Sequence, residues 1–308
     1  MRARVRQKTD RYHVDQCALY KVRGLSRLAE LLFTSVDRLE DFARRHSDMY
    51  SEWDIPSKPG KMRHIEHPAP PLKKIHARIE TLLMRLEPPG YLFCPVKGRD
   101  FLMNALQHHG QRAVWRVDVK DYFASTRSAN VLAFYRDRLN CAGDVATLLT
   151  KLSTFRGHLP TGSPLSPVLS FFANEPMWES IRATCDESGC SISLYMDDLT
   201  VSGEKVPWPL RQHILRALNQ NGFKGHKCQY AVARPALVTG LITGRARPTL
   251  PHSHFRKFRQ TLALAEGMVP PDELARMAAS LNGMMRLRRL ANARISRSRA
   301  LKDRFANR

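Results

Sequence analysis

The segment Tyr195-Met196-Asp197-Asp198 places two adjacent carboxylates between two short runs of alternating apolar and polar residues. Alternation with a period of two is typical of β-strands, so residues 191–202 predict a β-hairpin with the aspartates at its tip. Aspartate is also common in ordinary turns that bind nothing. Carboxylates so close together repel each other, however, and their burial is costly unless a positive charge such as a divalent cation compensates them.

A third carboxylate, Asp118, follows the apolar run 114–117. Alternation puts Val117 and Val119 on one face of a strand and Asp118 on the other. If this strand and the hairpin are neighbours in one sheet, their three aspartates form one site. Oxygen ligands favour Mg²⁺, and two such ions stabilise the attacking and leaving oxygens of an in-line phosphoryl displacement. The pattern therefore predicts two Mg²⁺ ions and nucleotidyl transfer.

Five motifs in order along the chain carry a family resemblance. Residues 118–123, 159–167 (Leu-Pro-Thr-Gly-Ser-Pro-Leu-Ser-Pro) and 195–198 match the palm motifs of polymerases, residues 104–108 match Asn-Ala-x-x-His, and residues 238–240 read Val-Thr-Gly. The last two are retron motifs, weak singly and specific together. On these motifs the chain resembles the reverse transcriptases and, among them, the retron reverse transcriptases.

The resemblance implies an α+β fold with the right-hand architecture of polymerases: fingers, a palm whose antiparallel sheet packs on helices, and a helical thumb. The boundaries that we expect are an N-terminal helical segment over 1–48, fingers over 49–113, a palm with the catalytic aspartates over 114–235, and a thumb with a basic C-terminal tail over 236–308.

The resemblance also implies a role for individual residues. The catalytic residues would be Asp118, Asp197 and Asp198, which with the backbone carbonyl of Val119 would also ligate the metal ions. The remaining residues would bind nucleotide (Lys61, Arg63, Asp121, Phe123 and Gly162) or would form the RNA-binding or family motifs (Asn104, His108, Val238, Thr239 and Gly240). A buried, hydrogen-bonded Asn104 and His108 is an equal alternative.

Some of these roles also have a physical reason in the sequence. Period two places Lys61 and Arg63 on one face of a strand, where they can neutralise a triphosphate, although a solvated basic strand would look the same. Phe123 holds the family position of an aromatic gate that would clash with a ribose 2′-hydroxyl; Tyr122 is its nearest decoy, and an ordinary core position is the alternative. The chain has Thr161 where the family usually has Gln, and Gln229 where it often has Lys.

Hydrophobic spacing predicts the other elements. We expect a pair of helices within 25–45 separated by a cap at Thr34 or Ser35, and a basic hairpin within 49–67. We also expect helices over the ranges 72–86, 131–139, 145–155, 168–181 and 274–285.

The charge of the chain points to a polyanionic partner. Fifty Lys and Arg against 28 Asp and Glu give a net charge of +22, and nucleic acid is the first candidate, ahead of an anionic membrane surface. The segment 286–308 is rich in Lys and Arg and predicts contact with a phosphate backbone. No apolar run reaches the roughly 18 residues of a spanning helix. We therefore expect a cytoplasmic protein without a membrane partner, and free thiols rather than disulfides.

As a retron reverse transcriptase, the chain would be an RNA-directed DNA polymerase that uses deoxynucleoside triphosphates. Its partner would be a structured noncoding RNA, which serves as template and primer and yields a branched RNA–DNA hybrid (msDNA) from a 2′-hydroxyl. The resemblance further implies an effector protein and a role in defence against phages. The alternatives are another bacterial reverse transcriptase, group II intron-like or diversity-generating, and a non-catalytic RNA-binding module with the polymerase fold.

Overall fold

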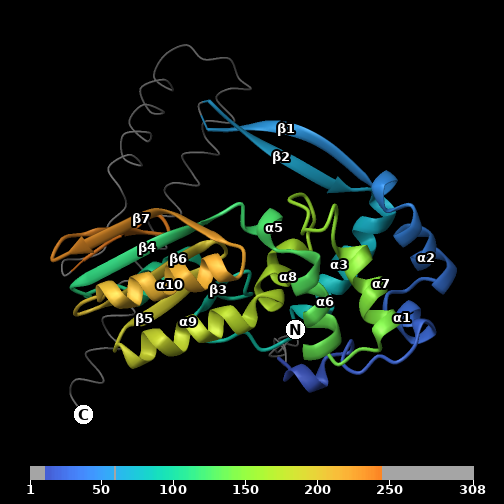
Figure 1. Ribbon diagram of the computed structural model, residues 1–308, viewed down its shortest axis with the longest axis horizontal. Helices are drawn as coiled ribbons and strands as arrows, with labels where there is room; N and C mark the ends of the chain where they lie inside the picture. The colour runs from blue at the N-terminus through green and yellow to red at the C-terminus, as the bar shows by residue number, and fades with distance from the viewer. Residues whose placement is uncertain (1–10, 59, 245–308) are drawn as a thin grey trace, which may run out of the picture.

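The computed structural model shown in Figure 1 describes residues 11–58 and 60–244. The chain has a mixed α/β fold, with one five-stranded sheet, two separate two-stranded ribbons and helices around them. The helix expected over 274–285, the basic segment 286–308 and most of the expected thumb lie outside the described residues. The part of the expected thumb that is described, 236–244, contains β8 (Ala236–Val238) and β9 (Leu241–Thr243).

The central sheet has the strand order β3-β5-β6-β4-β7. The strands are β3 (Leu92–Cys94), β4 (Ala113–Lys120), β5 (Ser191–Tyr195), β6 (Asp198–Gly203) and β7 (Lys224–Val232). The predicted hairpin of residues 191–202 is confirmed as β5 and β6, and β4 is antiparallel to β6 and β7. The edge strand β3 pairs with β5 in parallel and comes from the region that the sequence assigned to the fingers. The sheet is therefore antiparallel except at one edge.

The two faces of the sheet differ in chemistry, as the alternation predicted. Val117, Val119, Leu199 and Val201 are buried on one face, with at most 1% of each exposed. On this face Gly225 leaves no room for a side chain, since an added Cβ would lie 2.8 Å from Leu215 of α10 (Trp208–Gln220). Figure 1 shows α9 (Glu175–Glu187) and α10 lying across the sheet. The opposite face carries the polar residues.

Helices predicted from hydrophobic spacing are present in the N-terminal and central parts of the chain. Ser35 is the cap between α1 (Leu25–Leu31) and α2 (Val36–Arg44), because its hydroxyl accepts a hydrogen bond from the Arg38 backbone N–H. The other helices and short turns are η1 (Val14–Gln16), η2 (His46–Met49), α3 (Pro70–Leu83), α4 (Phe101–Gln107), α5 (Tyr122–Ser125), α6 (Ser128–Ala133), the π-helix η3 (Phe134–Arg138) and α7 (Gly143–Ser153).

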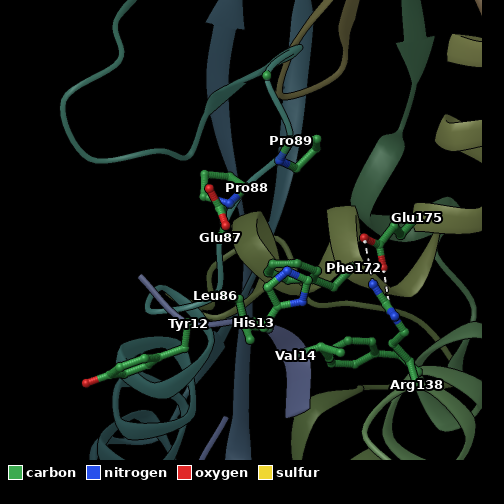
Figure 2. Close-up of a pocket in the computed structure, with 12 residues that line it drawn as sticks. Tyr12, His13, Val14, Leu86, Glu87, Pro88, Pro89, Arg138, Phe172 and Glu175 are labelled. Atoms are coloured by element: carbon green, nitrogen blue, oxygen red, sulfur yellow. Dashed lines mark hydrogen bonds and ion pairs between the residues drawn. The ribbon is translucent and has the colours of Figure 1, made fainter. Parts of the chain in front are cut away.

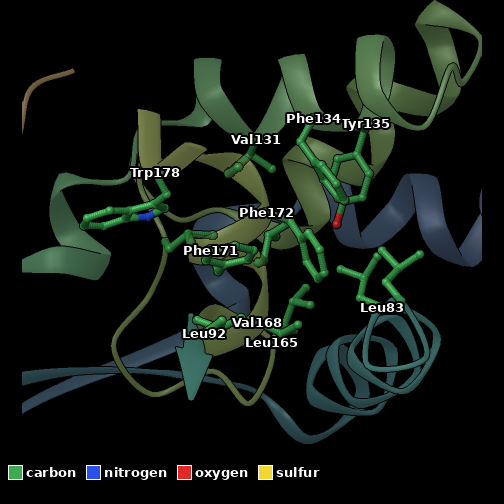
Figure 3. Close-up of a cluster of buried hydrophobic side chains, with 14 of the residues drawn as sticks. Leu83, Leu92, Val131, Phe134, Tyr135, Leu165, Val168, Phe171, Phe172 and Trp178 are labelled. Atoms are coloured by element: carbon green, nitrogen blue, oxygen red, sulfur yellow. The ribbon is translucent and has the colours of Figure 1, made fainter. Parts of the chain in front are cut away.

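One predicted helix is wrong in its extent. The segment 168–181 is divided between α8 (Ser166–Ala173) and α9, with Asn174 between them. Pro176 stands in the first turn of α9, and proline favours a helix start because it has no backbone N–H to donate. The break turns both helices into the core, where Figure 3 shows the side chains of Phe171, Phe172 and Trp178 gathered with those of α3 and η3.

The predicted basic hairpin is confirmed as the antiparallel ribbon of β1 (Tyr50–Lys58) and β2 (Lys61–Pro68). In Figure 1 it projects from the helical part of the molecule near α2 and α3. Its two faces also differ. Register places Trp53, Ile55 and Arg63 on one face, and the acidic residues Glu52 and Glu66 on the other.

The acidic face of the ribbon is fastened to the loop 158–162. Buried Glu66 accepts a hydrogen bond from His158 at 2.8 Å, and its backbone N–H donates to the Thr161 hydroxyl at 3.1 Å. The Thr161 hydroxyl in turn donates to the backbone oxygen of His64 at 2.9 Å. Gly162 packs against the same strand, and a Cβ there would lie only 2.7 Å from the Glu66 backbone oxygen. This contact gives Gly162 a packing reason independent of any ligand.

The Glu66–His158 pair predicts a pH-dependent stability. Burial raises the pKa of Glu66, but the hydrogen bond and charge of His158 outweigh it and the net pKa is lowered. The same hydrogen bond raises the pKa of His158 despite burial. Stabilisation by the His158 charge is therefore present below its unfolded pKa of about 6.5 and is lost as pH rises through the raised folded value. The contribution of Glu66 is present above its unfolded value of about 4.5 and is lost as pH falls through the lowered one.

We predict that His158→Gln lowers the free energy of unfolding by about 1 to 2 kcal/mol near pH 5.5 and by clearly less near pH 9. Urea unfolding at the two pH values measures the difference. His213→Gln, at an exposed position of α10, is the matched control and should show little effect at either pH. An equal loss at both pH values for His158→Gln would contradict a charged pair.

Candidate active site

The sheet brings the three predicted aspartates together. Asp118 of β4 and Asp198 of β6 are direct partners in the antiparallel register, where opposite Cβ atoms lie about 5 Å apart. The backbone N–H of Val119 donates to the carbonyl oxygen of Asp197 at 2.8 Å. The prediction that the two segments are neighbouring strands is thus confirmed. Like charges directly opposite each other destabilise a sheet, so the arrangement has no advantage for folding.

The turn that presents Asp197 is itself strained. Tyr195 and Asp198 are paired across the hairpin, which leaves Met196 and Asp197 as its tip. Met196 has a φ of 61°, a left-handed conformation that residues other than glycine rarely adopt. Strain of this kind persists only where the surroundings impose it, and it is concentrated at functional sites.

Electrostatics at the tip favour the binding of a cation. Burial raises the pKa of Asp197, and the charges of Asp118 and Asp198 raise it further. Burial also raises the pKa of Asp198, although the hydrogen bonds and charge of Arg116 oppose this. Within residues 11–58 and 60–244, no Lys, Arg or His forms an ion pair with Asp197. The Asp197 carboxylate is therefore partly buried and has no close counter-ion among the described side chains.

Cationic residues next to the other two aspartates were missed by the sequence analysis. The Lys227 ammonium donates to Asp118 Oδ2, and His226 Nε2 lies 3.4 Å from the same oxygen. The guanidinium of Arg116 donates to both carboxylate oxygens of Asp198, with Nε at 3.3 Å from Oδ1. Arg116 stands two residues before Asp118 on the same strand and so on the same face.

A register irregularity explains why Lys227 was not found. Arg116 pairs with Gln229 and Asp118 with His226, so two residues of β7 lie opposite one residue of β4. Such a β-bulge re-aims side chains, and Lys227 has a left-handed φ of 50° within it. Strict alternation would have put His226 and Lys227 on opposite faces. Because of the bulge both reach Asp118, and no period-two pattern signals this.

The donor set at the tip fits a hard divalent cation. Three carboxylates and a neighbouring backbone carbonyl, that of Val119, are oxygen donors of the type that Mg²⁺ prefers. Within the part of the chain that the structure describes, the three aspartates do not bring their ligand atoms within 4.8 Å of one another, whereas Glu52, His64 and Glu66 do. Both ring nitrogens of His64, however, already contact carboxylates at 3.0 Å, so this group is satisfied as an ion-pair network on the ribbon.

The structure places the residues predicted to bind nucleotide in different environments. Lys61 and Arg63 are exposed on β2, and the charge of Arg63 lowers the pKa of Asp197. Asp121 is exposed and pairs with Lys120 at 3.8 Å. Phe123 is partly buried at the edge of the core. Its decoy Tyr122 is buried and donates a hydrogen bond to the Ser170 backbone oxygen at 3.0 Å.

The two retron motifs contact each other although they are far apart in the chain. Asn104 of α4 donates to the Thr239 hydroxyl at 3.2 Å, and that hydroxyl donates to the Phe101 backbone oxygen at 2.7 Å. Thr239 and Gly240 form the turn between β8 and β9, with φ values of 39° and 89°. Buried Val238 packs with side chains of α4 and β4. The Val-Thr-Gly hairpin is therefore held against α4.

His108 connects the same helix region to the catalytic hairpin. Its ring nitrogens lie 2.7 Å from the hydroxyls of Ser193 on β5 and Ser202 on β6. Burial, together with the nearby Arg116 charge, lowers the pKa of His108 to about 3, so the ring is neutral near pH 7. Asn104 and His108 are both fully buried. Their side chains therefore act on the positions of the two hairpins rather than at the protein surface.

A cavity of 270 Å³ lies between η1, the end of α3 and the helices α8 and α9. Figure 2 shows the residues that line it. Its walls include Tyr12, Pro88, Phe134 and Phe172, and Arg138 pairs with Glu175 at 3.0 Å on one side. None of the three aspartates lines it.

Within the described part of the chain, no helix is both long and apolar enough to cross a membrane.

Comparison with known proteins shows relatives of one kind. The chain is 30% identical over 262 residues to the retron Mx162 reverse transcriptase of Myxococcus xanthus, an alignment that covers 73% of this chain and 54% of that protein. It is 26% identical over 190 residues to the retron Se72 reverse transcriptase of Salmonella heidelberg, covering 60% of this chain and 49% of the relative. No protein-family model matches the chain.

A third relative, the retron Ec86 reverse transcriptase of Escherichia coli, is 22% identical over 205 residues, covering 65% of this chain and 64% of its own length. The chain thus spans about half to two thirds of the length of these relatives. A mixed α/β fold with a multi-stranded sheet is compatible with a reverse transcriptase. Over the aligned residues the chain is similar to retron reverse transcriptases.

We predict that Asp197→Asn raises the free energy of unfolding in the absence of divalent ions by roughly 0.5 to 1 kcal/mol, because it removes a partly buried charge next to two like charges. The same change should remove the stabilisation that millimolar Mg²⁺ gives to the wild-type protein. Thermal unfolding with and without Mg²⁺ measures both effects.

The matched control for this experiment is Asp186→Asn, which removes an exposed carboxylate paired with Arg182 on α9. It should change stability little and leave the Mg²⁺ response intact. A Mg²⁺ response that survives Asp197→Asn would place the binding site elsewhere.

Proposed function

We propose that this protein is an RNA-directed DNA polymerase that copies a structured noncoding RNA into DNA. The observation that carries the proposal is the meeting of Asp118, Asp197 and Asp198 at one end of the sheet, in a chain similar to retron reverse transcriptases over most of its length. Asp118 and Asp198 have cationic partners, whereas Asp197 has no ion-pair partner among the described residues. Such a group of carboxylates suits phosphoryl transfer, because bound cations must supply positive charge at the reacting phosphate.

In the proposed mechanism Asp118 and Asp197, with the Val119 carbonyl, hold two Mg²⁺ ions. When bound, these ions supply positive charge to the attacking primer hydroxyl and to the leaving pyrophosphate. Asp198 supports the site, which agrees with its two hydrogen bonds from Arg116. Lys61 and Arg63, exposed on β2, would bind the triphosphate of the incoming deoxynucleotide.

The Lys227 ammonium on the neighbouring strand β7 compensates the charge of Asp118. A bound divalent cation would supply the same compensation. Lys227 is 52% exposed, so its side chain is free to move away when a divalent cation binds. This role for β7 goes beyond the site residues predicted from the sequence, which do not include Lys227.

The right-hand architecture is part of the proposal. The ribbon β1–β2 would serve as the fingers within 49–113, the sheet and its helices as the palm within 114–235, and residues 236–308 as the thumb and basic tail. The exposed side chains of Trp53 and Ile55 share a face with Arg63. An aromatic and apolar surface beside a basic residue suits bases and phosphates of a single strand.

The N-terminal segment 1–48 would support the fingers. The cytoplasmic location stays a prediction.

Phe123 tests the nucleotide part of the proposal. We predict that Phe123→Ala increases incorporation of ribonucleotides relative to deoxynucleotides by roughly tenfold or more, because the ring would no longer meet the ribose 2′-hydroxyl. Primer extension with each nucleotide type measures the ratio of kcat/KM values. Phe33→Ala removes an aromatic ring that is 77% exposed on another part of the surface and is the control. An unchanged ratio for Phe123→Ala would refute the gate.

The retron-specific part of the proposal is that the noncoding RNA also supplies the primer. Synthesis from an internal 2′-hydroxyl would give a branched RNA–DNA product (msDNA), and an effector protein would complete an anti-phage system. The contact between the Asn104 and Thr239 motifs supports a shared role in placing the Val-Thr-Gly hairpin for RNA binding.

We expect co-expression of the chain with the noncoding RNA encoded beside it to yield DNA joined to RNA through a bond that debranching enzyme cleaves. Asp197→Ala should abolish the product, whereas Asp186→Asn should retain it. A branched product that persists with Asp197→Ala would assign the synthesis to another enzyme. A protein that binds the RNA and folds normally, yet incorporates no deoxynucleotide with Mg²⁺, would instead be a non-catalytic binding module.

A further inference from the structure

Arg116 makes contacts to two parts of the site at once. Its Nε and Nη2 donate to the two carboxylate oxygens of Asp198, and its Nη1 donates to the backbone oxygen of Leu237. Leu237 is the middle residue of β8, next to the Val-Thr-Gly turn. One guanidinium therefore bridges a candidate catalytic residue and the hairpin that carries a retron motif.

Burial makes this bridge stiff. The side chains of Arg116 and Asp198 are only 20% and 18% exposed. A planar guanidinium that donates in parallel to a carboxylate fixes the orientation of both groups. A partly buried carboxylate that loses its only close counter-ion is strongly destabilised, so Asp198 is tied to the position of Arg116. The carbonyl of Leu237 then ties Arg116 to β8.

A second connection joins the same two hairpins on the other side of Arg116. Asn104 holds the turn at Thr239, while His108 contacts Ser193 and Ser202 of the catalytic hairpin. Asn104 thus holds the turn of the β8–β9 hairpin and His108 holds the base of the β5–β6 hairpin, whereas Arg116 acts near the tip of β5–β6, where Asp198 lies. Beside it lies a cavity of 470 Å³, lined by Tyr230, Arg234 and Leu237 among others. The cavity gives β8 room to shift relative to β7.

We propose that Arg116 is a positioning residue that couples the β8–β9 hairpin to Asp198. A ligand that displaces or orders the hairpin thereby changes the position of the Asp198 carboxylate. Conversely, a change at Asp198 changes the position or the order of the hairpin. On the proposed function, from which this inference takes its meaning, the ligand is the RNA bound by the Val-Thr-Gly hairpin. Coupling of this kind is reciprocal, so it is measurable from either end.

The experiment is a mutant cycle read by amide hydrogen exchange of residues 236–243 in the protein without nucleotide or RNA. Arg116→Lys keeps the positive charge but lacks the fork needed to reach Asp198 and Leu237 together. We expect it to accelerate exchange in 236–243. Asp198→Asn should also accelerate exchange there, because it weakens the hold on Arg116, and the two changes together should do no more than Arg116→Lys alone.

The matched control is Arg112→Gln, which removes an exposed arginine paired with Glu204 at 2.8 Å. It should leave exchange in 236–243 unchanged. Additive effects of Arg116→Lys and Asp198→Asn, or wild-type exchange in either single variant, would overturn the coupling. If Arg116→Lys fails to fold, the same cycle is measured with Arg116→Gln, Asp198→Asn and the variant that combines these two changes.

Primer extension adds a second readout. Arg116→Lys should lower kcat by roughly tenfold while the KM for deoxynucleotide changes less than twofold, since the nucleotide-binding residues are untouched. A rise in KM with kcat unchanged would contradict a positioning role. Should the wild-type protein incorporate no deoxynucleotide, the proposed function would fail, whereas the exchange cycle would still decide whether Arg116 couples the two elements.

Discussion

The structure depends on one electrostatic constraint: two strands place like-charged carboxylates directly opposite each other at the end of a sheet. Asp118 and Asp198 face each other across β4 and β6, and Asp197 follows in the strained turn. This arrangement is unfavourable without positive charge, and the surrounding elements supply it unevenly. Arg116 compensates Asp198 and Lys227 compensates Asp118, which leaves Asp197 as the carboxylate that an added cation would satisfy.

The elements around the sheet serve to hold this tip in place. The apolar face of the sheet is anchored on α9 and α10, while the polar face meets α4 and the β8–β9 hairpin. His108 and Asn104 link these parts through buried hydrogen bonds, and Arg116 links them through a guanidinium. Buried hydrogen bonds of this kind restrict the geometry, because a change of position leaves buried groups without partners, although the Oδ1 of Asn104 has no hydrogen-bond partner here. The retron motifs therefore have a structural meaning that is independent of direct contact with RNA.

The ribbon β1–β2 is fastened separately. Glu66, Thr161 and Gly162 join it to the loop before α8, so the exposed basic face with Arg63 is held in a defined direction. The resemblance to reverse transcriptases leads us to expect glutamine at the position of Thr161. The Thr161 hydroxyl instead contacts the backbone of the ribbon at Glu66 and His64.

The sequence by itself determined which residues share one face of a strand or helix, because alternation in strands and spacing in helices follow from local geometry. It thereby predicted the hairpin of residues 191–202, the placement of Asp118 on the face opposite to Val117 and Val119, and Ser35 as one of two candidate caps. Only the tertiary structure decided the break at Asn174, the β-bulge that turns Lys227 toward Asp118, and the bridge from Arg116 to Leu237. These features arise from pairing between segments distant in the chain, and a register shift of one residue leaves no trace in local periodicity.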